Sequence, residues 1–169
     1  MTPDDITDPL RPLQYVTDGL RVGALTEIDP GITPLVRTHR LLNGTRPFAA
    51  ILRQDIFDLC DHIDSLAGAV PDLSALETAP CIERWCGVVV EDLPVLVGLV
   101  TGHPRLRQGA RTVTSPLVRI ASDQGWARTF SRYYRLGRPD QSVFTALLAE
   151  GRLHPGARRF DIPDLGGWT

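Results

Sequence analysis

Apolar residues recur at three- and four-residue spacing between residues 47 and 67, which is the period of an amphipathic helix. Thr45 can cap the start of this helix and Gly68 can end it. The apolar positions are Phe48, Ile51, Leu52, Ile56, Leu59, Ile63 and Leu66. The opposite side is acidic, with Asp55, Asp58, Asp61 and Asp64. The pattern therefore predicts one helix with an apolar and an anionic side.

The period changes to that of strands after a short helix predicted from Asp72 to Thr78. The segment 84–101, WCGVVVEDLPVLVGLVTG, is rich in β-branched residues and divides near EDLP, which predicts two antiparallel strands. The segment 111–121 predicts a third strand, at an edge or a bulge because of Pro116. A last helix is expected from Asp140 to Glu150, ended by Gly151.

The N-terminal segment 14–44 carries Asp-Gly and Pro-Gly turn signals between β-branched stretches, which favours short hairpins. We therefore predict an α+β fold, in which an antiparallel β-meander packs on the amphipathic helix, with an N-terminal β-hairpin region and a short C-terminal helix that covers an edge. The expected parts are an arm with the hairpin extension (1–45), the core domain (46–138) and the C-terminal helix and tail (139–169).

The segment 125–137, GWARTFSRYYRLG, fits two structures. In a helix its aromatic and arginine residues separate onto different sides, and Gly137 caps the end. In a strand, Trp126, Arg128, Phe130, Arg132, Tyr134 and Leu136 alternate on one face. Strand propensity and the turn sequence SDQG just before it favour the strand.

Charge is distributed unevenly along the chain. Residues 1–101 hold 7 Arg and 15 acids, a balance of −8, whereas residues 102–169 hold 11 Arg and 5 acids, a balance of +6. Two interpretations stay open: the arginines are neutralised by the chain's own acidic half, or they face an anionic partner. In the second case the expected partner-binding residues are Trp126, Arg128, Arg132, Tyr134, Arg135, Arg111 and Arg119.

The sequence gives little support for a catalytic, metal-binding or cofactor-binding site. His103, in TGHPRL, is a weak candidate for a general base, and the alternative is that its imidazole caps a turn. Cys81 and Cys86 lack zinc-ligand spacing, and the aspartates at three-residue spacing are more typical of a solvated helix face than of a magnesium site. Phosphate-loop, dinucleotide, nucleophile-elbow and metalloprotease motifs are absent. We expect neither a metal nor a cofactor.

The sequence holds no apolar run of membrane-spanning length, and its N-terminus, MTPDDITDPLRP, is acidic. With three cysteines, an odd number that suits a reducing compartment, these features favour a cytoplasmic protein without a membrane partner.

Four segments, APCIERW (79–85), GHPRL (102–106), TSPLVRI (114–120) and GWARTFSRYYRLG, carry a family resemblance. Over roughly residues 47–138 the chain resembles an uncharacterised family of small alphaproteobacterial and plasmid-borne proteins, a domain of unknown function. The resemblance implies a mobile-element setting and transfers no catalytic residue. The function we expect is a non-catalytic accessory protein, regulatory or anti-defence, that engages an acidic partner. The alternatives are direct nucleic-acid binding and a small enzyme centred on His103.

Overall fold

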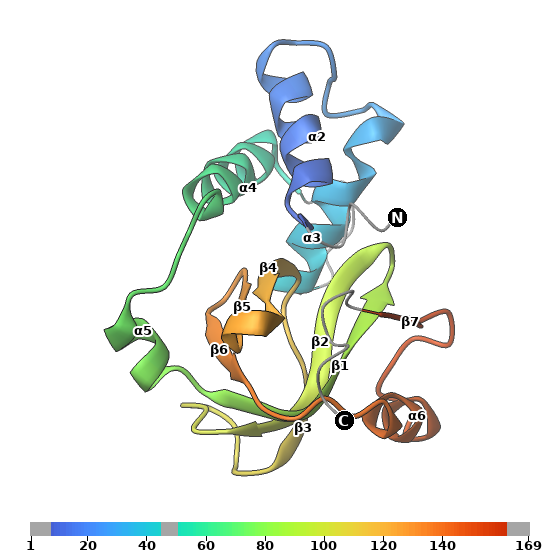
Figure 1. The fold of residues 1–169 in the computed structure, drawn as a ribbon. Coiled ribbons are helices and arrows are strands. Elements are labelled where there is room, and N and C mark those ends of the chain that lie inside the picture. Colours follow the sequence, from blue (N-terminus) through green and yellow to red (C-terminus); the bar gives the residue numbers. More distant parts are fainter. Residues whose placement is uncertain (1–7, 45–50, 162–169) are drawn as a thin grey trace. The chain divides into compact units, whose positions relative to one another are not determined.

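The computed structural model describes residues 8–44 and 51–161. The chain forms two compact units, Met1–Ala69 and Val70–Thr169. Helices make up the first unit and a sheet dominates the second, as the blue and the green-to-red segments of Figure 1 show. The α+β class predicted from the sequence is therefore confirmed.

The N-terminal unit contains α2 (Arg11–Arg21), the 3-10 helix η1 (Pro30–Ile32), α3 (Thr33–Asn43) and α4 (Arg53–Leu66). The predicted hairpins over 14–44 are wrong, because α2 and α3 each have a proline in the first turn and bury residues at helical spacing. In α2 these residues are Leu13, Val16, Thr17 and Leu20. The Asp-Gly pair lies inside α2, where Gly19 approaches Leu25 so closely that a Cβ would lie 2.8 Å from it.

Helix α4 is the amphipathic helix predicted within 47–67. It buries Ile56, Leu59, Cys60, Ile63 and Leu66. It begins at Arg53, because the Asp55 carboxylate accepts a hydrogen bond from the Leu52 backbone N–H at 2.8 Å. The predicted cap, Thr45, lies outside the described residues.

Helix α4 packs against α2 and α3 within its own unit. Two of its acids are engaged there: Arg21 bonds Asp61 at 2.8 Å and also Asp64.

The C-terminal unit begins with α5 (Leu73–Thr78), whose predicted cap Asp72 accepts from the Ala75 N–H at 2.7 Å. A seven-stranded sheet follows, in the order β3-β2-β1-β6-β5-β4, with β7 paired to β1. Its strands are β1 (Cys81–Val90), β2 (Leu93–Thr101), β3 (Ala110–Val113), β4 (Leu117–Ala121), β5 (Trp126–Thr129), β6 (Tyr133–Leu136) and β7 (Arg158–Phe160). All pairs are antiparallel except β1 with β6, so two antiparallel groups join through one parallel pair.

The predicted division at EDLP is confirmed, because Glu91 and Asp92 turn the chain from β1 to β2 with φ of 50° and 65°. The predicted third strand over 111–121 forms as two strands, β3 and β4, on either side of the segment that contains Pro116. These two strands end the sheet path on opposite sides.

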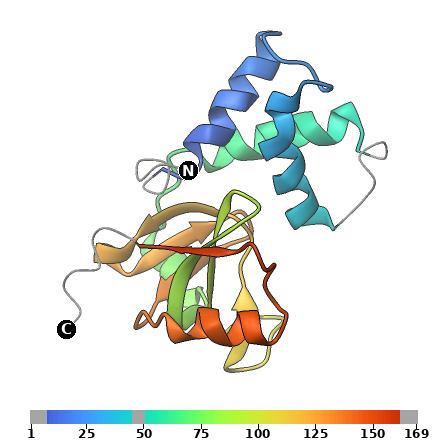
Figure 2. The same cartoon turned by 90° about the vertical axis from the view of Figure 1, so that its right-hand side faces the viewer.

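Two apolar cores lie on the two faces of the β1–β2 hairpin. One face contributes Ile82, Trp85 and Leu96 to a cluster that also contains Leu117, Ala127 and Tyr134. The other face packs Val88 and Val95 against α6 (Ser142–Ala149), the orange helix below the green strands in Figure 2. Helix α6 therefore covers a face of the sheet and not the edge that the sequence suggested.

A bulge in β1 distributes these residues between the two cores. The register of β1 on β2 shifts between Glu83 and Cys86, and Arg84 adopts a left-handed φ of 49°. Arg84 is held there by Asp140, whose carboxylate accepts from the Arg84 Nε at 2.8 Å. Trp85 consequently enters the first core while Cys86 enters the second.

Candidate functional site

Strands β4, β5 and β6 form a three-stranded antiparallel group with one apolar and one cationic face. The register sets Arg119 opposite Arg128 and Arg128 opposite Tyr133. In the next row Trp126 lies opposite Arg135. Residues directly opposite each other share a face, as do residues two apart on one strand. We call Arg119, Trp126, Arg128, Tyr133 and Arg135 the arginine face.

The other face of the same strands belongs to the core. Ala127 and Tyr134 are buried in the first apolar cluster, and Ile120 and Leu136 pack against that cluster. Because this face is held by the core, the strands keep the arginine face in a fixed orientation.

Cations and rings interleave on the arginine face. The Arg128 guanidinium carbon lies 4.7 Å from the centroid of the Tyr133 ring, and that of Arg119 lies 5.7 Å from the Trp126 ring. The two rings meet edge to face at 6.0 Å and 72°. These distances are typical of cation–π and edge-to-face aromatic contacts, so each of the two rings helps to hold a guanidinium in place.

The guanidiniums of the arginine face lack acidic partners among the described residues of the C-terminal unit. No ion pair involves Arg119, Arg128 or Arg135 there, and the Arg135 Nε donates to the Ala79 carbonyl at 3.1 Å. Nearby acids have other contacts: Asp140 pairs with Arg84, and Glu83 accepts from the Arg138 backbone N–H at 3.2 Å and lies 3.4 Å from the Cys81 Sγ. The arginine face is thus a cluster of cations without acidic partners in the described part of the C-terminal unit.

Arg128 has the least favourable environment on this face. It is half-buried, and its Nε is fully covered without a hydrogen-bond acceptor among the described residues. Burial lowers the pKa of Arg128, and the adjacent Tyr133 opposes this shift. A buried charged donor without an acceptor costs free energy of folding.

The remaining predicted residues are not on the arginine face. Tyr134 is buried on the core side. Arg111 is engaged internally, since it pairs with Glu150 and its carbonyl accepts from Arg152 at 2.7 Å. Arg132 lies in the turn between β5 and β6, and its Nε is buried without an acceptor among the described residues.

Tyr133 was missed because 126–136 is not one continuous strand. The chain turns at 130–132, where the Thr129 N–H donates to the Arg132 carbonyl at 2.9 Å. The turn shifts the alternation, so Tyr133 joins Trp126 and Arg128 while Tyr134 faces the core. The polar pair Ser131 and Arg132 within an aromatic run is the sequence signal that pointed to this turn.

His103 caps a turn in the β2–β3 loop. Its Nδ1 accepts from the Arg105 backbone N–H at 3.1 Å, so the neutral ring carries its proton on Nε2. Partial burial and the charges of Arg132 and Arg105 lower the pKa of His103. No hydrogen bond or ion pair joins it to a carboxylate within the described ranges.

The cysteines and acids of the described segments form no group of three or more metal-ligating side chains. Burial raises the pKa of Cys86 to about 11, so its thiol stays protonated at neutral pH. Among the described helices, none is long and apolar enough to cross a membrane.

Comparisons with known proteins give one match. Residues 50–159 match a family model described as a family of unknown function, DUF6634. No curated protein and no solved structure matches the chain. The matched range contains every strand of the arginine face, from β4 through β6.

Proposed function

The chain belongs to the DUF6634 family of unknown function, and we propose from its own chemistry that it is a non-catalytic binding protein that engages an acidic protein segment through the arginine face. The observation that carries the proposal is Arg128, a half-buried cation with a covered Nε and no acceptor among the described residues. A carboxylate brought by a partner would supply the missing counter-charge, and guanidinium–carboxylate pairs are strong and directional.

The position of the rings favours a carboxylate-bearing partner over single-stranded nucleic acid. Nucleic-acid platforms need exposed rings on which bases stack. Trp126 is only 3% exposed, with Arg119 over its ring, and Arg128 covers one side of Tyr133. The face therefore offers guanidiniums and few open ring surfaces, which suits recognition of charge without stacking.

The proposal also includes a biological role, which is an accessory role, regulatory or anti-defence, on a mobile element. Only the family resemblance supports this part of the proposal. The contacts of the arginine face do not bear on it. Direct nucleic-acid binding is kept as an outcome of the test below, because phosphate would satisfy the same guanidiniums.

The test is a titration of the full chain against two fluorescent probes of equal charge, an oligoglutamate peptide and a single-stranded oligonucleotide. The variant Arg119→Gln/Arg128→Gln removes two charges from the face and keeps part of each stem. Each charge-assisted contact is worth about 1.5–3 kcal/mol, so this variant should bind the peptide at least about tenfold more weakly. Anisotropy in low salt measures both affinities.

The matched control is Arg107→Gln/Arg158→Gln, which removes the same charge from an exposed loop and from β7. It should bind the peptide within about twofold of the unmodified chain. Equal weakening by both double variants would mean diffuse charge attraction and would defeat the proposal. Tighter binding of the oligonucleotide, with a steep salt dependence that the face variant loses, would replace it by nucleic-acid binding.

A further inference from the structure

The GHPRL segment lies in the β2–β3 loop, outside the arginine face, and the sheet register brings it to the same end as a further arginine. Thr101, at the end of β2, pairs with Cys81 at the start of β1, and Cys81 pairs with Arg135 on β6. Because β2 is antiparallel and β6 is parallel to β1, the chain after Thr101 and the chain before Arg135 leave the sheet at the same end. His103 and Arg132 therefore both lie beyond this end of the strands.

The His103 ring has one nitrogen left for a ligand. Its Nδ1 accepts from the Arg105 backbone N–H at 3.1 Å, so the Nε2–H of the neutral ring is the group that can donate to a bound molecule. Partial burial lowers the pKa of His103, and the charges of Arg132 and Arg105 lower it further. Two guanidiniums from different loops therefore act on this one ring.

Both guanidiniums lack a counter-charge in the described part of the chain. Neither Arg105 nor Arg132 forms an ion pair with a described residue. Arg132 is half-buried and its Nε is covered without an acceptor among those residues, whereas Arg105 is exposed. An anion beside the His103 ring would meet two permanent positive charges and one N–H donor.

We infer that His103, Arg105 and Arg132 bind a terminal phosphate group, as free phosphate or as a phosphate monoester. A phosphate monoester carries about 1.5 to 2 negative charges at neutral pH and three strong acceptor oxygens, which match two guanidiniums and one N–H donor. A carboxylate or a phosphodiester carries a single negative charge and would leave one cation unbalanced. The inference does not depend on the proposed function, because none of the three residues belongs to the arginine face.

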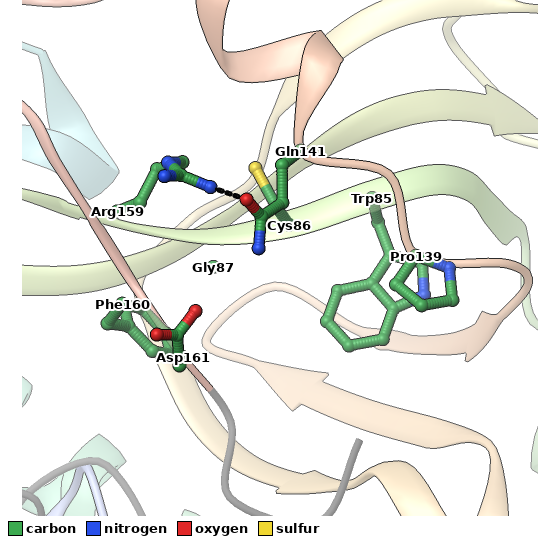
Figure 3. Close-up of a pocket in the computed structure, with 8 residues that line it drawn as sticks. All are labelled: Trp85, Cys86, Gly87, Pro139, Gln141, Arg159, Phe160 and Asp161. Carbon is green, nitrogen blue, oxygen red and sulfur yellow. Dashed lines mark hydrogen bonds between the residues drawn. The ribbon is translucent and has the colours of Figure 1, made fainter. Parts of the chain in front are cut away.

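A pocket where β1 meets β7 offers different chemistry. It has a volume of about 260 Å³, and the one cation in its lining, Arg159, already donates to the Gln141 Oε1 (Figure 3). The Asp161 carboxylate lines the same pocket and would repel an anion. Phosphate is therefore expected at the His103 cluster and not in this pocket.

The experiment is a titration of the full chain with inorganic phosphate and with glycerol 3-phosphate, followed by NMR of the histidine ring signals at neutral pH and constant ionic strength. His154 is an internal control, because it caps an exposed turn in the same way: its Nδ1 accepts from the Gly156 backbone N–H at 3.0 Å. We expect saturable shifts of the His103 ring and none of the His154 ring. The tighter of the two ligands identifies free phosphate or a monoester as the preferred form. Acetate and dimethyl phosphate should bind at least about tenfold more weakly, since each leaves one charge-assisted contact unmade.

Arg105→Gln and Arg132→Gln should each weaken phosphate binding at least about tenfold, because each removes one charge-assisted contact. Arg107→Gln is the matched control: it removes the same charge from an exposed position of the same loop and should bind within about twofold of the unmodified chain. Arg105 is exposed, so Arg105→Gln keeps the test decisive if Arg132→Gln alters the fold.

Three results would overturn the inference. The first is a His103 ring that phosphate leaves unmoved, or that moves together with the His154 ring. The second is binding of acetate or dimethyl phosphate as tight as that of phosphate. The third is an Arg105→Gln variant that binds phosphate as tightly as Arg107→Gln.

Discussion

Replacing Arg128 by methionine should stabilise the protein, which is unusual for the loss of a charged residue. The side chain is half-buried on the arginine face, and its Nε is covered without an acceptor among the described residues. Methionine is flexible enough to follow the course of the arginine stem and brings no buried donor. The substitution therefore removes the costly part of the residue and keeps much of its packing.

The expected size follows from two opposing terms. A buried, charged donor left without an acceptor costs about 1–3 kcal/mol. The contact with the Tyr133 ring at 4.7 Å, which methionine gives up, is worth about 0.5–1 kcal/mol. The net expectation for Arg128→Met is an increase of about 0.5–2 kcal/mol in the free energy of unfolding, together with loss of partner binding.

Urea denaturation followed by tryptophan fluorescence measures this change, because Trp85 and Trp126 are buried within the C-terminal unit. The control is Arg111→Met, which breaks an exposed pair with Glu150 and should lower stability by about 0–1 kcal/mol. A loss of more than about 1 kcal/mol in Arg128→Met would refute the reasoning, since it would show that Arg128 is a structural residue.

Two further predictions concern the C-terminal unit. Gly87→Ala should lower the free energy of unfolding by about 1–3 kcal/mol, because the alanine Cβ would collide with the Phe160 ring. Adding Phe160→Leu should recover part of this loss, which thermal melts of the single and double variants measure. Asp140 accepts hydrogen bonds from Ser142 and Arg84, which lowers its pKa from 3.8 to about 2, so its stabilising effect is present above pH 4 and is lost as the pH falls through 2. Urea midpoints at pH 7, 4 and 2.5 should therefore fall more steeply below pH 4 for the unmodified chain than for Asp140→Asn, and parallel curves would contradict this.

Much of the C-terminal unit could be predicted because its signals are local. The switch of period after Thr78, the turn at Glu91 and Asp92 and the cap at Asp72 each act within a few residues of the element that they define. The strand interpretation of 126–136 also held, since aromatic and β-branched residues there outweigh the helical spacing.

The errors have a common cause, which is that a short turn or a single close contact can override the pattern of a whole segment. The turn at 130–132 moved Tyr133 onto the arginine face and Tyr134 into the core, which no count of alternating residues could show. In the N-terminal unit, the Asp-Gly turn signal was overridden by the packing of Gly19 against Leu25 within a helical unit. Pro12 followed by Leu13, Val16 and Leu20 was the stronger signal there, and it indicates a helix.

The central claim is that carboxylates of an acidic partner pair with the guanidiniums of the arginine face. NMR of the arginine Nε–H signals during titration with the oligoglutamate peptide tests this claim most directly. The Nε–H signals of Arg119 and Arg128 should shift and saturate together, because the peptide carboxylates approach these two guanidiniums. Arg111, already paired with Glu150, should stay unchanged. Saturable binding that leaves Arg119 and Arg128 unmoved would contradict the account.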